Sequence, residues 1–152
     1  MMRHMEPRLD LLTLGVPDLD AAHRFYVDGL GWEPALVVED EVVFIQVGHS
    51  RLLALFGADA LEEDSGEGPG FGPAAAAPMS LAQNVRSEDE VRAVMASAEA
   101  AGATILKPAQ RAFWGGFHGY FADPAGFRWE VAYNPNMRVD PDGRVRIGED
   151  NV

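Results

Sequence analysis

The chain has 152 residues, of which 47% are hydrophobic and 24% charged, and this composition is that of a globular domain with its own core. Its formal net charge of −12 repels phosphate backbones and anionic membranes, so we expect no nucleic-acid or membrane partner. The absence of cysteine excludes disulfides, thiolate nucleophiles and cysteine-ligated metals, and it fits a reducing compartment. No apolar run approaches transmembrane length and residues 1–8 lack a signal-peptide core, so we expect a cytoplasmic protein.

The first part of the chain, about residues 9–56, reads as strand, helix and three strands. A leucine-rich strand ends at Pro17, and Asp18 then stands where a helix N-cap belongs. Apolar residues recur at helical spacing after it, until Gly29 and Gly31 stop the helix. The three following strands are expected at 32–39, 42–47 and 51–56.

The next stretch, residues 57–78, is rich in glycine, proline and acidic residues. It predicts a short helical turn near 59–64 and otherwise loop structure. A connection of this length is either a linker between two repeats or a lid over a site, and the two are compatible.

Residues 79–135 repeat the order of the first part. A strand at 79–86 leads into a capping box formed by Ser87 and Glu90, and the helix ends at Gly102. A strand at 104–110 and an aromatic hairpin complete the repeat. The remaining residues, 136–152, form a polar tail in which Asp142-Gly143 predicts a small hairpin.

The aromatic hairpin turns at Asp123-Pro124-Ala125-Gly126 and carries a carboxylate, Glu130, in its second strand. A four-residue turn sets Glu130 opposite Gly119, which predicts that Phe117 shares the face of Glu130 and that His118 points the other way. A carboxylate half buried in a sheet needs a cation, a proton or hydrogen-bond donors.

Two segments carry a family likeness: VPDLDAAHRFYVDGLGW after the first strand and GYFADPAGFRWEVAYNP at the last hairpin. With two tandem repeats of strand, helix and three strands, residues 9–135 resemble the vicinal oxygen chelate superfamily. That superfamily includes glyoxalase I, extradiol dioxygenases and bleomycin-resistance proteins. The resemblance implies one α+β domain of two βαβββ modules that form a paired-sheet cleft, with module one at about 9–56, a linker or lid at 57–78, module two at about 79–135 and the tail at 136–152.

In metal-dependent members, the resemblance assigns four ligand positions, which fall here on Leu11, Ala54, Ser80 and Glu130. Leucine and alanine cannot bind a metal, and a neutral serine is a poor ligand. We therefore expect no metal and no cofactor.

The leading hypothesis is a metal-free protein that binds a small aromatic or amphipathic molecule in the cleft. The competing hypothesis is an enzyme of the same superfamily with a substituted site, either lactoylglutathione-lyase-like or dioxygenase-like. The residues expected to line the cleft are Leu11, Thr13, Phe44, Gln46, Ala54, Ser80, Ala82, Asn84, Trp114, Phe117 and Glu130.

Three side chains have alternative interpretations. Glu130 is a metal ligand, a polar group that contacts the bound molecule, or a carboxylate satisfied by Arg128, Arg111 or a nearby hydroxyl. Trp114, beside two glycines, either stacks on a flat ligand or plugs the sheet edge. His118 is either a ligand-binding or basic group, or part of the packing.

Members of this superfamily often form dimers, and Pro34 and Pro108 mark possible sheet edges, so we expect a twofold homodimer.

Overall fold

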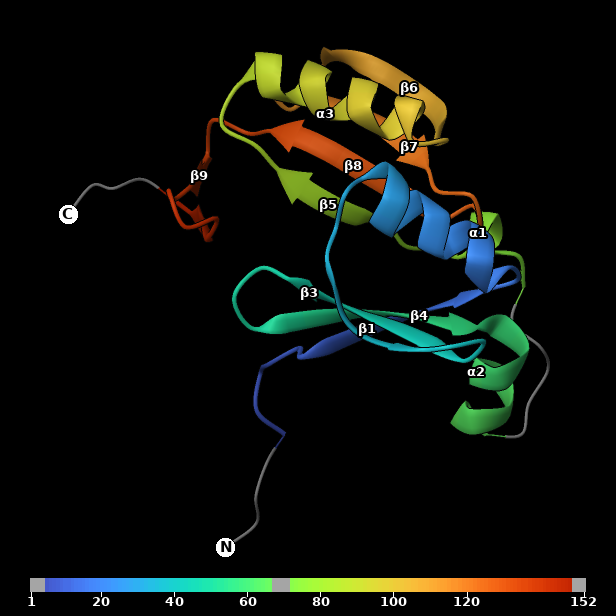
Figure 1. Ribbon diagram of the computed structural model, residues 1–152. Helices are drawn as coiled ribbons and strands as arrows, with labels where there is room; N and C mark the ends of the chain where they lie inside the picture. The colour runs from blue at the N-terminus through green and yellow to red at the C-terminus, as the bar shows by residue number, and fades with distance from the viewer. Residues whose placement is uncertain (1–4, 67–71, 149–152) are drawn as a thin grey trace, which may run out of the picture.

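The computed structural model describes residues 5–66 and 72–148 and contains two four-stranded sheets with helices packed on them (Figure 1). In chain order the elements are β1 (Leu11–Val16), α1 (Leu19–His23), a π-helix η1 (Arg24–Gly29), β2 (Pro34–Val38), β3 (Val42–Val47), β4 (Arg51–Gly57), α2 (Ala58–Ser65), a 3-10 turn η2 (Ala74–Ala76), β5 (Leu81–Asn84), α3 (Glu88–Ala100), β6 (Thr104–Arg111), β7 (Phe117–Ala122), β8 (Arg128–Tyr133), β9 (Met137–Val139) and β10 (Val145–Ile147).

The two sheets have the same topology, which confirms the α+β fold of two tandem modules. Their strand orders are β1-β4-β3-β2 and β5-β8-β7-β6. In each sheet the first and last strands of the module pair in parallel, and the other neighbours are antiparallel. β2 and β6, which contain Pro34 and Pro108, are each an edge strand at one end of a sheet, and each shows an irregularity in its pairing. Proline fits such positions because it cannot donate to a sheet ladder.

Side-chain caps start the helices where the sequence predicts them. The Asp18 carboxylate accepts a hydrogen bond from the Ala21 amide at 2.9 Å. The Ser87 hydroxyl accepts from the Glu90 amide at 3.1 Å, and the Glu90 carboxylate accepts in return from the Arg86 amide at 2.7 Å. These bonds satisfy donors that have no partner inside the helix. The hairpin predicted in the tail is also present, as the antiparallel pair of β9 and β10.

The segment between the modules is only partly loop. Its first residues form α2, which packs against β1, and a Cβ added at Gly15 would lie 3.1 Å from the Leu61 side chain. Residues 67–71, within the predicted linker or lid, lie outside the described residues, so its role as a lid stays a prediction. None of the helices in the described ranges is long and apolar enough to cross a membrane.

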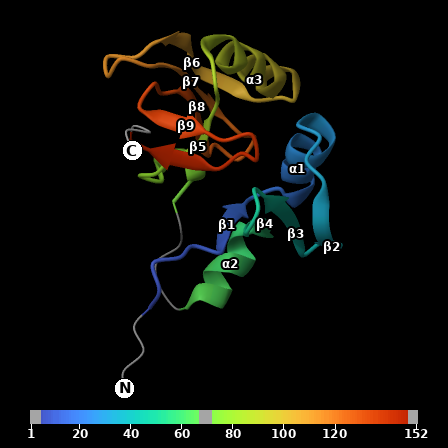
Figure 2. The same ribbon diagram turned by 90° about the vertical axis from the view of Figure 1, so that its left-hand side faces the viewer.

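The helical segment of module one lies between the two sheets (Figures 1 and 2). It buries Phe25 and Tyr26 completely, at 1% and 0% exposure. The Phe25 ring packs against Phe121 of β7, with ring centroids 6.3 Å apart. The first helix of the chain therefore contributes to the packing of both modules.

The β7–β8 register differs from the predicted one. Ala122 pairs with Arg128, which sets Glu130 opposite Tyr120 rather than Gly119. The cause is the turn: the Asp123 carboxylate accepts hydrogen bonds from the Gly126 and Phe127 amides, and the Asp123 amide donates to the Phe127 carbonyl. This makes the connection one residue longer than expected.

The changed register reverses the predicted facing of the neighbouring side chains, because successive residues of a strand point to opposite faces. His118 shares the face of Glu130. Phe117 points instead toward α3, where the Arg92 guanidinium lies 4.5 Å from its ring centroid. The prediction that Phe117 and Glu130 share a face was wrong.

Candidate functional site

The structure separates the predicted cleft residues into two groups, one on each sheet. On the first sheet, Thr13 and Phe44 both flank Ala54, and Leu11 and Gln46 both flank Leu52. On the second sheet, Ala82 pairs with Glu130. Asn84 pairs with Ala132, which also pairs with His118. Ser80 lies just before β5 and is exposed, and Trp114 contacts His118.

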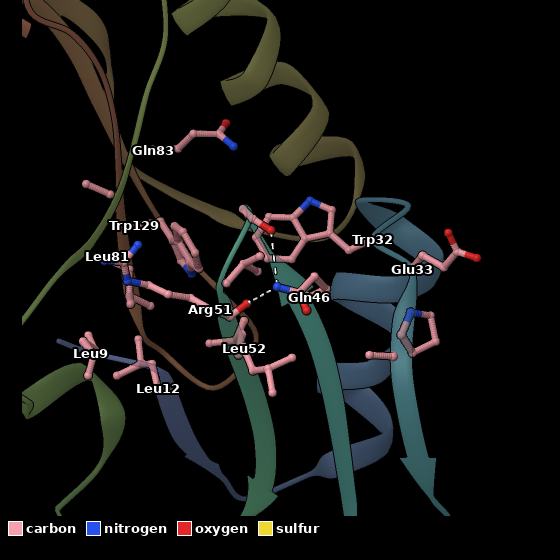
Figure 3. Close-up of a pocket in the computed structure, with 16 residues that line it drawn as sticks. Leu9, Leu12, Trp32, Glu33, Gln46, Arg51, Leu52, Leu81, Gln83 and Trp129 are labelled. Atoms are coloured by element: carbon pink, nitrogen blue, oxygen red, sulfur yellow. Dashed lines mark hydrogen bonds between the residues drawn. The ribbon is translucent and has the colours of Figure 1, made fainter. Parts of the chain in front are cut away.

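A cavity of about 760 Å³ lies between the two modules (Figure 3). The residues that line it are Leu9, Leu12, Trp32, Glu33, Pro34, Ala35, Gln46, Val47, Gly48, Arg51, Leu52, Leu53, Leu81, Ala82, Gln83 and Trp129. We call this cavity the inter-module pocket. Its walls are mostly aliphatic and aromatic, and Gln46 and Ala82 are the predicted cleft residues that contribute to it.

Four of the strand residues that line the inter-module pocket are sequence neighbours of the predicted metal-ligand positions. Leu12, Leu53, Leu81 and Trp129 line it, and each is one residue away from a position to which the resemblance assigned a metal ligand. Because side chains alternate along a strand, these four side chains point to the opposite faces of the sheets from Ala54 and Glu130. The pocket also touches Gln46, Leu52 and Ala82, which belong to the faces of Ala54 and Glu130.

Two indoles from different modules meet at the pocket. The Trp32 and Trp129 ring centroids are 5.7 Å apart, in an edge-to-face arrangement. The Trp129 indole N–H donates to the Tyr26 hydroxyl at 2.9 Å, and that hydroxyl donates to the Asp123 carboxylate at 2.7 Å. This chain of hydrogen bonds fixes the Trp129 ring and joins the modules.

Burial changes the acidity of the two ionisable groups in this chain. Desolvation raises the pKa of Asp123 above its usual value, although its bonds from Tyr26 and the turn amides act in the opposite direction. Desolvation also raises the pKa of Tyr26 far above the usual value of a phenol, and the nearby Asp123 carboxylate adds to this effect. The Tyr26 hydroxyl therefore remains a proton donor.

The polar groups of the inter-module pocket lie beside its apolar walls. Figure 3 shows Arg51 between Trp129 and the leucines, Gln83 above Trp129, and Glu33 beyond Trp32. The Gln46 amide donates to the Arg51 carbonyl at 2.8 Å, which ties this side chain to the β3–β4 turn. A second cavity of about 240 Å³ shares Trp32, Gln83 and Trp129 with the first.

Glu130 is satisfied by neighbours on its own sheet. His118 Nδ1 lies 2.7 Å from the Glu130 carboxylate, and the Tyr120 hydroxyl also hydrogen-bonds to it. Partial burial, followed by this bond, raises the pKa of Tyr120. The sequence interpretation of Glu130 as a carboxylate satisfied by a neighbouring group agrees with this geometry, but the partners are His118 and Tyr120 rather than an arginine.

The residues at the family's metal positions do not fit a metal ion. Leu11 and Ala54 offer no donor atom, and the Glu130 carboxylate is already held by His118. Across residues 5–66 and 72–148, no three histidine, aspartate or glutamate side chains are grouped closely enough to hold an ion.

Sequence reasoning missed most of the lining residues of the inter-module pocket. Neither Trp32 nor Trp129 is among the residues that the sequence predicts for the cleft, yet both line the pocket. The available signal was the alternation of β8, which placed Trp129 away from Glu130. Alternation along β8 could not reveal that the face of Trp129 lies against the other module.

The comparisons with known proteins agree with this architecture. The family profile described as Glyoxalase/Bleomycin resistance protein/Dioxygenase superfamily matches residues 8–131. The chain therefore belongs to this superfamily. A comparison with curated proteins found none that matches.

Several solved structures are similar to this one. A glyoxalase-related enzyme from Fulvimarina pelagi is 38% identical, with a TM-score of 0.85 over 95% of this chain and 100% of that one. A lactoylglutathione lyase from Agrobacterium tumefaciens is 26% identical, with a TM-score of 0.66 over 86% of this chain and 96% of that one. A superfamily protein from Nocardioides is 23% identical, with a TM-score of 0.71 over 86% and 85% of the two chains, and supports the fold alone.

Proposed function

We propose that this protein binds a small aromatic or amphipathic molecule in the inter-module pocket without a metal ion. The observation that carries the proposal is a cavity of about 760 Å³ with two indoles and a mostly aliphatic wall. Pockets that hold small ligands have volumes of about 300–1,000 Å³ and are mainly apolar with a few polar groups. The Trp32 and Trp129 rings offer a flat molecule aromatic contacts from both modules.

The polar lining supports an amphipathic ligand. Arg51 and Glu33 are the charged side chains of the pocket, and Gln46 and Gln83 add amide groups. The amide group of Gln46 is already bound to backbone carbonyls. Arg51 and Gln83 are therefore the groups that we expect to contact the polar end of the ligand, and a guanidinium favours an acidic or carbonyl oxygen there.

We test the proposal with 8-anilinonaphthalene-1-sulfonate, an aromatic probe with one anionic end, and measure binding by calorimetry. Leu81→Trp should fill part of the pocket and weaken binding at least tenfold. The matched control is Leu106→Trp, the same change at a 48% exposed position of β6 that does not line the pocket. Equal affinity in both variants would contradict the proposal. Mass spectrometry of molecules retained from a native extract would then identify the natural ligand.

The second candidate function is an enzyme of the lyase or dioxygenase type, and the observation that favours it is the contact of Glu130 with His118. The two candidates differ in their need for a metal. Elemental analysis after gentle purification should find far less than one equivalent of zinc, nickel, manganese or iron, because Leu11, Ala54 and Ser80 replace three ligands. Near-stoichiometric metal, lost in Glu130→Gln, would favour the enzyme.

A further inference from the structure

The second cavity, of about 240 Å³, adjoins the inter-module pocket on the side of module two. Helix α3 provides one wall through Ala93, Val94 and Ala98. Strands β7 and β8 provide another through Phe121 and Val131. Ala98, Phe121 and Val131 are buried core residues, so the packing of module two fixes the shape of these walls.

The lining of the second cavity differs from that of the inter-module pocket in charge. Arg51 and Glu33 place charged groups in the pocket. Of the described residues that line the second cavity, none is charged, and Gln83 and Ser97 are its polar side chains apart from the two indoles. A charged group would lose its hydration there without gaining an ionic partner, whereas a hydrocarbon group would lose nothing. The second cavity therefore suits an aliphatic group.

The two cavities meet at Trp32, Gln83 and Trp129, which line both (Figure 3). The Trp129 indole is held by its hydrogen bond to the Tyr26 hydroxyl, and it stacks on Phe121 with the ring planes 9° apart. Within the described part of the chain, no hydrogen bond holds the side chain of Trp32 or Gln83. Trp32 and Gln83 can therefore rotate to admit a ligand while Trp129 stays in place.

We propose that the ligand is an aromatic acid with an unbranched aliphatic chain, and that this chain occupies the second cavity. The inference rests on the proposed function, because the ring of the same molecule lies in the inter-module pocket and its acidic end meets Arg51. A chain on the opposite side of the ring from the acid then points away from the guanidinium. Each part of the molecule thus meets a surface of matching polarity.

Two probes isolate the contribution of the chain. 4-Methylbenzoate and 4-butylbenzoate share the ring and the carboxylate and differ by three methylene groups. Burial of one methylene group tightens binding about fourfold. We expect calorimetry to show that 4-butylbenzoate binds at least tenfold more tightly, and NMR to show contacts between its terminal methyl group and the Val94 methyl groups.

Variants on α3 locate the chain. Ala93→Leu fills part of the second cavity and should lower the affinity for 4-butylbenzoate to that for 4-methylbenzoate, which should be unchanged. Ser97→Leu, one turn along the helix, should act in the same way. Both positions are exposed and leucine is a good helix former, so the fold should be retained. The matched control is Ala96→Leu, at an exposed position that lines neither cavity, and it should keep the tenfold preference.

A variant at the other end of the molecule tests its orientation. Arg51→Gln should weaken the binding of both acids at least threefold and by the same factor, because the guanidinium contacts the carboxylate that they share. Unchanged affinities, or a loss confined to one acid, would contradict the position of the carboxylate.

The outcomes separate this inference from the proposed function. Equal affinity of the wild-type protein for the two acids, or a tenfold preference that survives Ala93→Leu, would overturn the assignment of the second cavity. The proposed function would then stand if Leu81→Trp still weakened the binding of 8-anilinonaphthalene-1-sulfonate. If Leu81→Trp changed the affinity for neither the sulfonate nor the two acids, the proposed function and this inference would both be wrong.

Discussion

At the scale of single residues, Tyr26 connects the two modules more directly than any other side chain that we describe. It comes from η1 in module one, and both of its hydrogen-bond partners, Asp123 and Trp129, belong to module two. Its side chain is fully buried. Removal of its hydroxyl would leave a buried carboxylate oxygen and a partly buried indole N–H without this partner.

We therefore expect Tyr26→Phe to lower the free energy of unfolding by about 2–3 kcal/mol, as expected for loss of a hydrogen bond to a charged group. Denaturant unfolding of the variant measures this value. Tyr133→Phe is the matched control, since it makes the same change at a half-buried tyrosine. An equal and small decrease in the free energy of unfolding in both variants would show that the hydrogen bonds of the Tyr26 hydroxyl do not stabilise the contact between the modules.

Asp123 should give the stability an identifiable pH dependence. Burial raises its folded-state pKa above the ordinary value of 3.8, so between these two values the folded protein holds more protons than the unfolded chain. Stability from this group therefore falls as the pH rises through that window. The other carboxylates add their own dependence, so a comparison with a variant is needed.

Asp123→Asn keeps a neutral acceptor for the turn amides but does not ionise. We expect the stability advantage of the wild-type protein over Asp123→Asn to be largest below pH 4 and to shrink as the pH rises through the folded-state pKa. Unfolding curves of both proteins at several pH values would test this. A stability difference between the two proteins that stays constant, or that grows with pH, would contradict the upward shift of the Asp123 pKa.

At the scale of elements, the end of η1 touches the end of α3. A Cβ built at Gly29 would lie 2.7 Å from the Ala101 Cβ and 3.2 Å from the Ala101 carbonyl oxygen. Real side chains do not approach so closely, and here the neighbour includes backbone that cannot rotate away. Glycine at this position thus allows the helical segments of the two modules to meet.

Gly29→Ala should push these segments apart and destabilise the protein by about 1–3 kcal/mol, as overpacked interiors do. The control is Gly57→Ala, because its added methyl would meet only the Ala60 Cβ at 3.9 Å and its φ is negative. Thermal unfolding should show a clear decrease in Tm for Gly29→Ala alone. Equal Tm values for Gly29→Ala and Gly57→Ala would mean that η1 and α3 move apart without loss of stability.

At the scale of the whole molecule, the sheet faces outside the inter-module core remain partly apolar and exposed. On the edge strand β2, Leu36, Val37 and Val38 are 55%, 47% and 38% exposed, and Leu11 of β1 is 41% exposed. Exposed edge strands with apolar residues promote pairing with another chain. These features support the proposal of a twofold homodimer.

Light scattering should give twice the chain mass of 16.5 kDa at micromolar concentration. Val37→Lys on β2 should shift the equilibrium toward the monomer through charge repulsion. Ile147→Lys, at an 80% exposed position of β10, should leave the mass unchanged. A monomeric wild-type protein at these concentrations would rule out the dimer.

The sequence by itself determined the repeated module, the helix starts and the chemistry available at the metal positions. These properties depend on residues that are close together in the chain. Asp18 and Ser87 cap helices through bonds to amides three residues away, and strand or helix periodicity is visible within a few residues. Leu11 and Ala54 lack donor atoms in any fold.

Only the tertiary structure decided the β7–β8 register and the position of the cavity. The Asp123 carboxylate lengthened the turn by one residue, which was enough to bring His118 onto the face of Glu130. Alternation assigns residues to two faces, but it does not say which face meets the other module. That choice depended on the burial of Tyr26 between the sheets, where its hydroxyl binds groups about 100 residues away in the chain.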